Sequence, residues 1–411
     1  MRAISIVIAA IAIAAALLFW TTRQQEQAVV EARDTTAERP TISDPAAPAP
    51  SAPATASERA DWFPDLGDRG EIPGLADGVT EGRATFGCDI GELLEDAAPM
   101  LARADRGVQD PRLDALVDAL SASADAELLL ANVAARNFQA NAGPEESYDA
   151  AEAAAFDDLA RAVQADATNP LVLWYASWYC AAASDTTVSC EDPVLQGNVE
   201  AILGANGVYW ARDAGYLYSR GEHDAALDAL KRSATSPTFD SYFIENVRLM
   251  ERALSLAPDV DYIERAVAAY AMTEDMMSPG YRLARMCETQ AVLDDEWFAA
   301  CMSVAQRGAT EGRTIAERLR AADLLGSLHM MSGDMARRDD ALALSDHLQQ
   351  AMRRQDDFAA VVLTDERVMS QFFEEFEAGD ELSATLYVQT EVERLRRDPD
   401  FDPCPAGEAD D

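Results

Sequence analysis

The sequence predicts an all-helical fold for the folded part of this chain. From about residue 89 onward Ala, Leu, Asp, Glu and Arg dominate, and apolar residues recur at spacings of three and four, the period of an amphipathic helix. Runs of β-branched residues are few, so we expect no strand. Turn signals such as Asp110-Pro111, Asn169-Pro170 and Gly333 divide the region into intervals of one or two helices.

The first 20 residues are predicted to be a membrane anchor. Ile4 to Trp20 form an apolar run of 17 residues interrupted only by Ser5, which as a helix spans about 26 Å, enough for a thin bilayer core. The nearby Ala-x-Ala triplets lie inside the run, so retention is favoured over cleavage as a signal peptide. With Arg2 holding the short end in the cytoplasm, we expect a single-pass protein of the bacterial inner membrane with its body in the periplasm. Cleavage would make it periplasmic or secreted.

Two segments separate this anchor from the helices. Residues 21–60 contain five prolines among Ala, Ser and Thr and almost no large apolar side chain, so we expect a disordered tether that leans toward polyproline II. Residues 61–88 are rich in proline and glycine, which indicates an irregular lead-in packed on the first helix. Residues 89–411 then form one α-helical domain.

The charge balance limits the partners. There are 33 Lys and Arg against 73 Asp and Glu, a net charge of −40. A surface this negative repels phosphate backbones, so nucleic acid is excluded as a partner. It favours partners with basic surfaces, through an attraction that weakens as salt rises.

Cysteine spacing predicts a set of disulfides, the default state of cysteines in an exported protein. Cys180 and Cys190 flank a polar stretch that ends a helix, so a bond between them would staple a loop between two helices. Cys287 and Cys301 lie 14 residues apart with their midpoint at Asp294, where a helix N-cap signal occurs. That spacing brings two antiparallel helices into register.

The remaining cysteines, Cys88 and Cys404, would by elimination join the two ends of the folded body. Alternatively, Cys404 is free or bonds a second chain. A metal or catalytic thiol site is the rival interpretation, but there is no Cys-x-x-Cys motif and no histidine within five residues of any cysteine.

One segment, from Trp210 to Pro237, resembles a tetratricopeptide (TPR) repeat, in which large and small residues alternate on two helices joined at a glycine. The pattern is carried by Trp210, Ala214, Leu217, Gly221, Ala226, Leu230 and Ser233. Fainter echoes occur around residues 155–174 and 317–342, and the charged Asp213 departs from the repeat pattern. The resemblance covers about a quarter of the chain and implies an irregular TPR-like α-solenoid stapled by the disulfides. An ordinary irregular helical domain is the alternative.

No motif indicates catalysis. The sequence has no His-Glu-x-x-His, no Gly-x-Ser-x-Gly and no glycine-rich phosphate loop, and we expect neither an enzyme nor a cofactor. The alternating acids at Asp398, Asp400 and Asp402 lack the glycine and glutamate that an EF-hand needs at its sixth and twelfth positions. The TPR resemblance implies a scaffold with a concave groove for envelope proteins.

The alternative function is an envelope enzyme or a metal-handling protein. Eight methionines gather between residues 272 and 335: Met272, Met276, Met277, Met286, Met302, Met330, Met331 and Met335. Their thioethers, with His329 nearby, could hold Cu(I). The competing interpretation is that these methionines fill gaps between helices in the core.

Overall fold

The computed structural model describes residues 86, 88, 90–105, 110–142, 148–182, 188–274, 280–353 and 355–404. The predicted anchor (1–20), the tether (21–60) and nearly all of the lead-in (61–88) lie outside the described residues. Among the helices that are described, none has the length and apolar character needed to cross a membrane.

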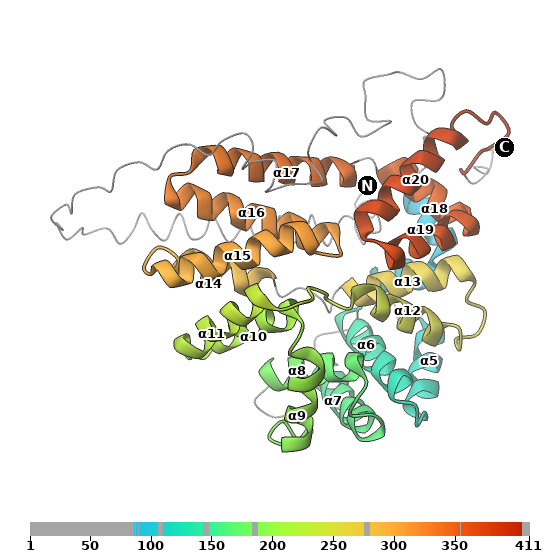
Figure 1. The fold of residues 1–411 in the computed structure, drawn as a ribbon. Coiled ribbons are helices and arrows are strands. Elements are labelled where there is room, and N and C mark those ends of the chain that lie inside the picture. The colour runs from blue at the N-terminus through green and yellow to red at the C-terminus, as the bar shows by residue number, and fades with distance from the viewer. Residues whose placement is uncertain are drawn as a thin grey trace, which may run out of the picture.

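The described part of the chain contains eighteen helices, and its only β contact is an isolated bridge between Asn206 and Thr238. The predicted all-helical class is therefore confirmed. Most helices form antiparallel hairpins with their neighbour in sequence (Figure 1).

A first hydrophobic core combines helices from both ends of the described chain. It is built from α3 (Ile90–Ala97), α4 (Pro99–Asp105), α5 (Pro111–Ser121), α6 (Ala126–Ala142), α7 (Tyr148–Ala165), α8 (Pro170–Ala182), α9 (Pro193–Leu203), α12 (Phe243–Leu254), α13 (Tyr262–Glu274), α18 (Gln355–Thr364), α19 (Glu366–Ala378) and α20 (Glu381–Leu395). The aromatic stripe of α19 lies inside this core, with Phe373 and Phe376 fully buried. It therefore serves as internal packing of the fold.

A second core lies between the remaining helices. These are α10 (Gly207–Ser219), α11 (His223–Thr235), α14 (Gly280–Gln290), α15 (Asp295–Glu311), α16 (Ile315–Ser332) and α17 (Met335–Arg353). Figure 1 shows α14 to α17 as a stack of neighbouring helices. The hairpins do not stack in chain order, because α11 packs on α15 whereas α12 packs on α6 and α19.

Helix boundaries follow the predicted turn signals. Asp110 caps α5, its carboxylate accepting a hydrogen bond from the Arg112 amide at 2.9 Å, and Pro111 opens the helix. Asn169 likewise accepts from the Leu171 amide at 2.9 Å before Pro170. Gly333, at φ +77°, ends α16 in the left-handed conformation that favours glycine.

A buried carboxyl connects the two cores. Glu381, at the start of α20, accepts hydrogen bonds from the Tyr270 hydroxyl of α13 and from the Ile315 amide of α16, both at 2.6 Å. Burial raises the pKa of Glu381. Since α13 and α20 belong to the first core and α16 to the second, these two bonds fix the cores relative to each other.

All three expected disulfide bonds are present: Cys88–Cys404, Cys180–Cys190 and Cys287–Cys301. The first spans 316 residues and joins the two ends of the described body. Phe86 packs edge-on against Phe401 beside it, with ring centroids 5.6 Å apart, and its amide donates to Asp357 at 2.8 Å. The ends of the fold are thus held by covalent, apolar and polar contacts at one place.

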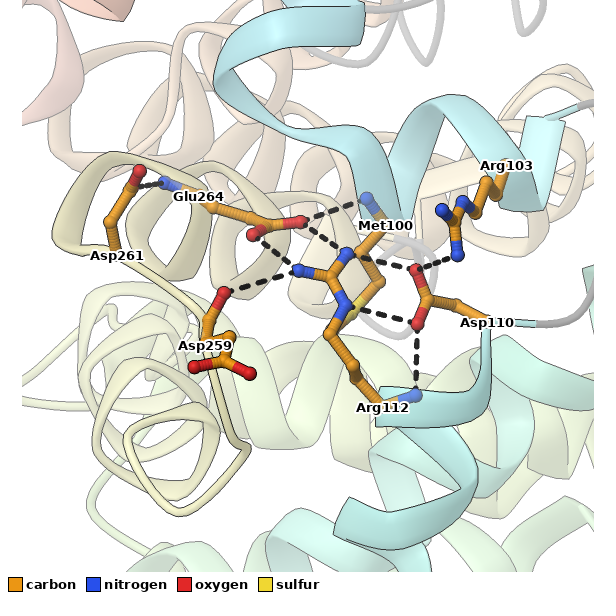
Figure 2. Close-up of polar contacts among 7 residues, drawn as sticks. All are labelled: Met100, Arg103, Asp110, Arg112, Asp259, Asp261 and Glu264. Atoms are coloured by element: carbon orange, nitrogen blue, oxygen red, sulfur yellow. Dashed lines mark hydrogen bonds and ion pairs between the residues drawn. The ribbon is translucent and has the colours of Figure 1, made fainter.

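Helices α4, α5 and α13 meet at a buried charge network, shown in Figure 2. The Arg112 guanidinium lies between the carboxylates of Asp110 and Glu264, with Nη2 2.9 Å from an oxygen of each. Glu264 also accepts from the Met100 amide at 2.8 Å. Burial acts to raise the pKa of Asp110, but the hydrogen bonds and charge of Arg112 outweigh it and hold that pKa below its ordinary value.

Candidate functional site

The candidate site is a hollow of about 290 Å³ between α8, α9 and α10. Its wall combines polar and apolar groups: Ser177, Cys180, Ala181, Cys190, Leu195, Gln196, Val199, Glu200, Tyr209, Asp213 and Arg220. The Cys180–Cys190 disulfide forms part of this wall, so the covalent bond that joins the end of α8 to the start of α9 also shapes the hollow.

Asp213 is the chemically distinctive group in the hollow. Its side chain is partly buried, and within the described part of the chain no hydrogen bond or ion pair engages its carboxylate. Burial raises its pKa above the ordinary value of 3.8, although the nearby charges of Arg212 and Arg220 act to lower it. A partly desolvated carboxylate that no hydrogen bond or ion pair engages is stabilised when a cation comes within hydrogen-bond distance of it.

Arg212, the residue before Asp213 on α10, is buried and turned toward α8. Its Nη2 donates to the Ser177 hydroxyl at 2.6 Å and to the Trp174 carbonyl at 3.3 Å, and its guanidinium lies 4.0 Å from the centroid of the Trp174 ring. Burial lowers the pKa of Arg212 to about 10, so it remains charged at neutral pH. The Arg212 guanidinium is therefore held by groups of α8 and forms no ion pair with Asp213.

Other contacts keep α8 and α10 in place. The Trp178 indole N–H donates to the Tyr216 hydroxyl at 2.6 Å. Tyr209 lies beside Asp213 on the wall, and burial raises the pKa of its phenol to about 12. The phenol therefore stays protonated at neutral pH and can both donate and accept a hydrogen bond.

The seven predicted repeat residues lie together in the α10–α11 hairpin. Ala214, Ala226 and Leu230 are fully buried, Trp210 is buried and Leu217 is partly buried. Gly221 forms the turn at φ +81°, and the Ser233 hydroxyl donates to the Gly207 carbonyl at 2.7 Å. The side of α10 that packs in the second core carries Trp210, Ala214 and Leu217. Tyr209 and Asp213 each come one residue before a packing residue, and on a helix of 3.6 residues per turn this places them on the neighbouring side, which faces the hollow.

The hollow is not predicted by the sequence. The only sequence signal for it is the charge of Asp213, which departs from the repeat pattern. A charge at a helix position flanked by packing residues is costly unless a partner or solvent receives it.

The other chemical candidates are dispersed. His223 of α11 is exposed and stacks on Tyr218, His329 of α16 is buried, and His347 of α17 is partly buried. Among the described residues, no group of three or more His, Cys, Asp or Glu side chains could hold a metal ion. Met272 and Met286 are buried and fill the core, whereas Met330, Met331 and Met335 are exposed; Met276 and Met277 lie outside the described residues.

Comparison of the chain with family models, with curated proteins and with solved structures finds no match.

Proposed function

We propose that this protein is a non-catalytic binding scaffold of the bacterial envelope, and that its α8–α10 hollow receives a lysine or arginine side chain of a partner protein. The partly buried Asp213 carboxylate, which no described group pairs, is the observation that carries the proposal. A cationic side chain would supply the missing charge and form charge-assisted hydrogen bonds with it.

The dimensions of the hollow fit such a ligand. Pockets for drug-sized molecules span roughly 300–1,000 Å³, and this hollow of about 290 Å³ is at the lower end, suited to one long side chain. The aliphatic part of a lysine or arginine would lie against Leu195 and Val199, while its charged end reaches Asp213. The net charge of −40 would attract basic surfaces from a distance.

Two features support a location in the bacterial envelope. The apolar run at residues 4–20 would anchor the chain in the inner membrane, and the three disulfides suit an oxidising compartment such as the periplasm. The α10–α11 hairpin, with its resemblance to a TPR repeat, would provide the rigid frame on which Asp213 is displayed.

Asp213→Asn is expected to weaken binding of a basic peptide by at least tenfold. A hydrogen bond to a charged group contributes roughly 1.5–3 kcal/mol, which corresponds to about ten- to 150-fold in affinity. Peptides would be selected by display against the full-length protein in nanodiscs, and their affinities measured by calorimetry. We expect the selected peptides to share a lysine or arginine.

Asp224→Asn is the matched control, because Asp224 is exposed on α11 and its replacement changes the net charge by the same amount. The control should bind within about twofold of the wild type. Equal binding by wild type and Asp213→Asn, or selected peptides without a cation, would contradict the proposal.

Peptide affinity is also expected to rise with pH across the titration of Asp213. Burial raises the pKa of this carboxyl in the free protein, so it loses its charge at a higher pH than an ordinary aspartate when the solution is acidified. The cation binds the charged form, and affinity therefore falls as pH drops through that raised pKa. Calorimetry between about pH 3.5 and pH 7 tests this; a flat profile in the wild type, or one unchanged by Asp213→Asn, would refute it.

A further inference from the structure

Three methionines are exposed at the turn between α16 and α17. Met330, Met331 and Met335 are 56 %, 37 % and 47 % exposed, while Met272 and Met286 are buried in the cores. The three exposed residues therefore do not serve as core filling, the role that methionine ordinarily has between helices.

The turn holds these side chains on one short, well-defined segment. The Asp334 amide donates to the His329 carbonyl at 3.0 Å and the Gly333 amide to the Met330 carbonyl at 3.1 Å, the paired bonds of a Schellman motif. The chain reverses at Gly333. Met330 and Met331 lie in the last turn of α16, which ends at Ser332, and Met335 is the first residue of α17. Three flexible thioether side chains thus extend into solvent from six consecutive residues.

The donor chemistry of the rest of the described chain makes this turn distinct. All six cysteines are in disulfides, and no cluster of His, Cys, Asp or Glu in the described residues has the make-up of a metal site. Among the described methionines only the three at this turn are exposed, so their thioethers are the soft donors that solvent can reach. A thioether does not form disulfides, so it remains a ligand in an oxidising compartment that removes free thiols.

We propose that Met330, Met331 and Met335 bind one Cu(I) ion at the α16–α17 turn. Cu(I) is a soft ion that prefers sulfur, and three neutral thioethers can coordinate it without the deprotonation that a thiol requires. The acidic protein would also concentrate cations near its surface. This site is independent of the α8–α10 hollow, and neither proposal depends on the other.

The test is a titration of the full-length protein with Cu(I) under anaerobic reducing conditions in competition with a chromogenic Cu(I) chelator. We expect one Cu(I) per chain with a submicromolar dissociation constant. Replacing all three residues, Met330→Leu, Met331→Leu and Met335→Leu, should weaken binding at least 100-fold, because leucine keeps the size and apolarity but removes the sulfur. Met302→Leu, the same change on α15 away from the turn, is the control and should bind as the wild type does.

Nuclear magnetic resonance of the protein labelled with ¹³C at the methionine methyl groups locates the ion. Of the 13 methionines, three signals should shift on addition of Cu(I), and those three should be absent from the triple variant. Binding weaker than about 10 μM, binding unchanged in the triple variant, or shifts confined to other methionines would overturn the proposal. Vesicle or peptide binding by this turn without copper binding would overturn it too, in favour of an apolar docking surface.

Discussion

Replacing both Cys88 and Cys404 with serine is expected to lower the free energy of unfolding by about 5 kcal/mol, and the melting temperature by roughly 10 °C. The bond closes a loop of 316 residues, and a crosslink restricts the unfolded chain more strongly as the loop it closes becomes longer. Thermal unfolding of the two proteins, followed by circular dichroism under non-reducing conditions, measures the difference.

The Cys180→Ser, Cys190→Ser double variant is the control, because that bond closes a loop of only 10 residues. Its expected cost is about half as large. An equal or smaller loss for the Cys88–Cys404 variant would show that the non-covalent contacts of Phe86 and Asp357 already hold the two ends together.

Arg112→Ala is expected to destabilise the protein by about 3–5 kcal/mol, because truncating one partner of a buried ion pair leaves the other charge uncompensated. In this case two buried carboxylates, those of Asp110 and Glu264, would face each other without the guanidinium between them (Figure 2). The network joins α4, α5 and α13, so urea unfolding should show the loss as a lower midpoint.

Arg103→Ala provides the comparison. Arg103 also contacts Asp110, at 3.5 Å, but its side chain is 45 % exposed, and an exposed ion pair contributes at most about 1 kcal/mol. Similar losses in the two variants would mean that Arg112 acts as an ordinary surface charge.

Local structure was predictable wherever short-range chemistry determines it. Asp110 and Asn169 accept hydrogen bonds at helix starts, and Gly333 adopts a left-handed conformation at a helix end. The Cys287–Cys301 pairing followed from the symmetric spacing of the two cysteines around the Asp294 N-cap. Each of these features depends on residues close in sequence.

The arrangement of the helices could not be read in the same way. Helices α12 and α13 pack in the first core, whereas α10 and α11 before them and α14 and α15 after them pack in the second. The apolar periodicity of these helices does not indicate which core each one joins. Contacts such as Tyr270 with Glu381 join residues more than a hundred positions apart. The hollow beside Asp213 was missed for the same reason, since three helices must come together before its wall exists.

The pairing of the cysteines has a consequence for the order in which the protein matures. The first cysteine of the sequence bonds the last, and the other two bonds are local and nested inside that pair. In the proposed export of the chain from its N-terminus, Cys88 would reach the oxidising side first but would have to wait for Cys404. The four cysteines between them would pass first as competing partners. Bond formation in order of emergence would trap a wrong pairing. On this proposed route, correct pairing would need a thiol isomerase or helix assembly that precedes oxidation. The Cys88–Cys404 bond would close only after Cys404 has crossed the membrane.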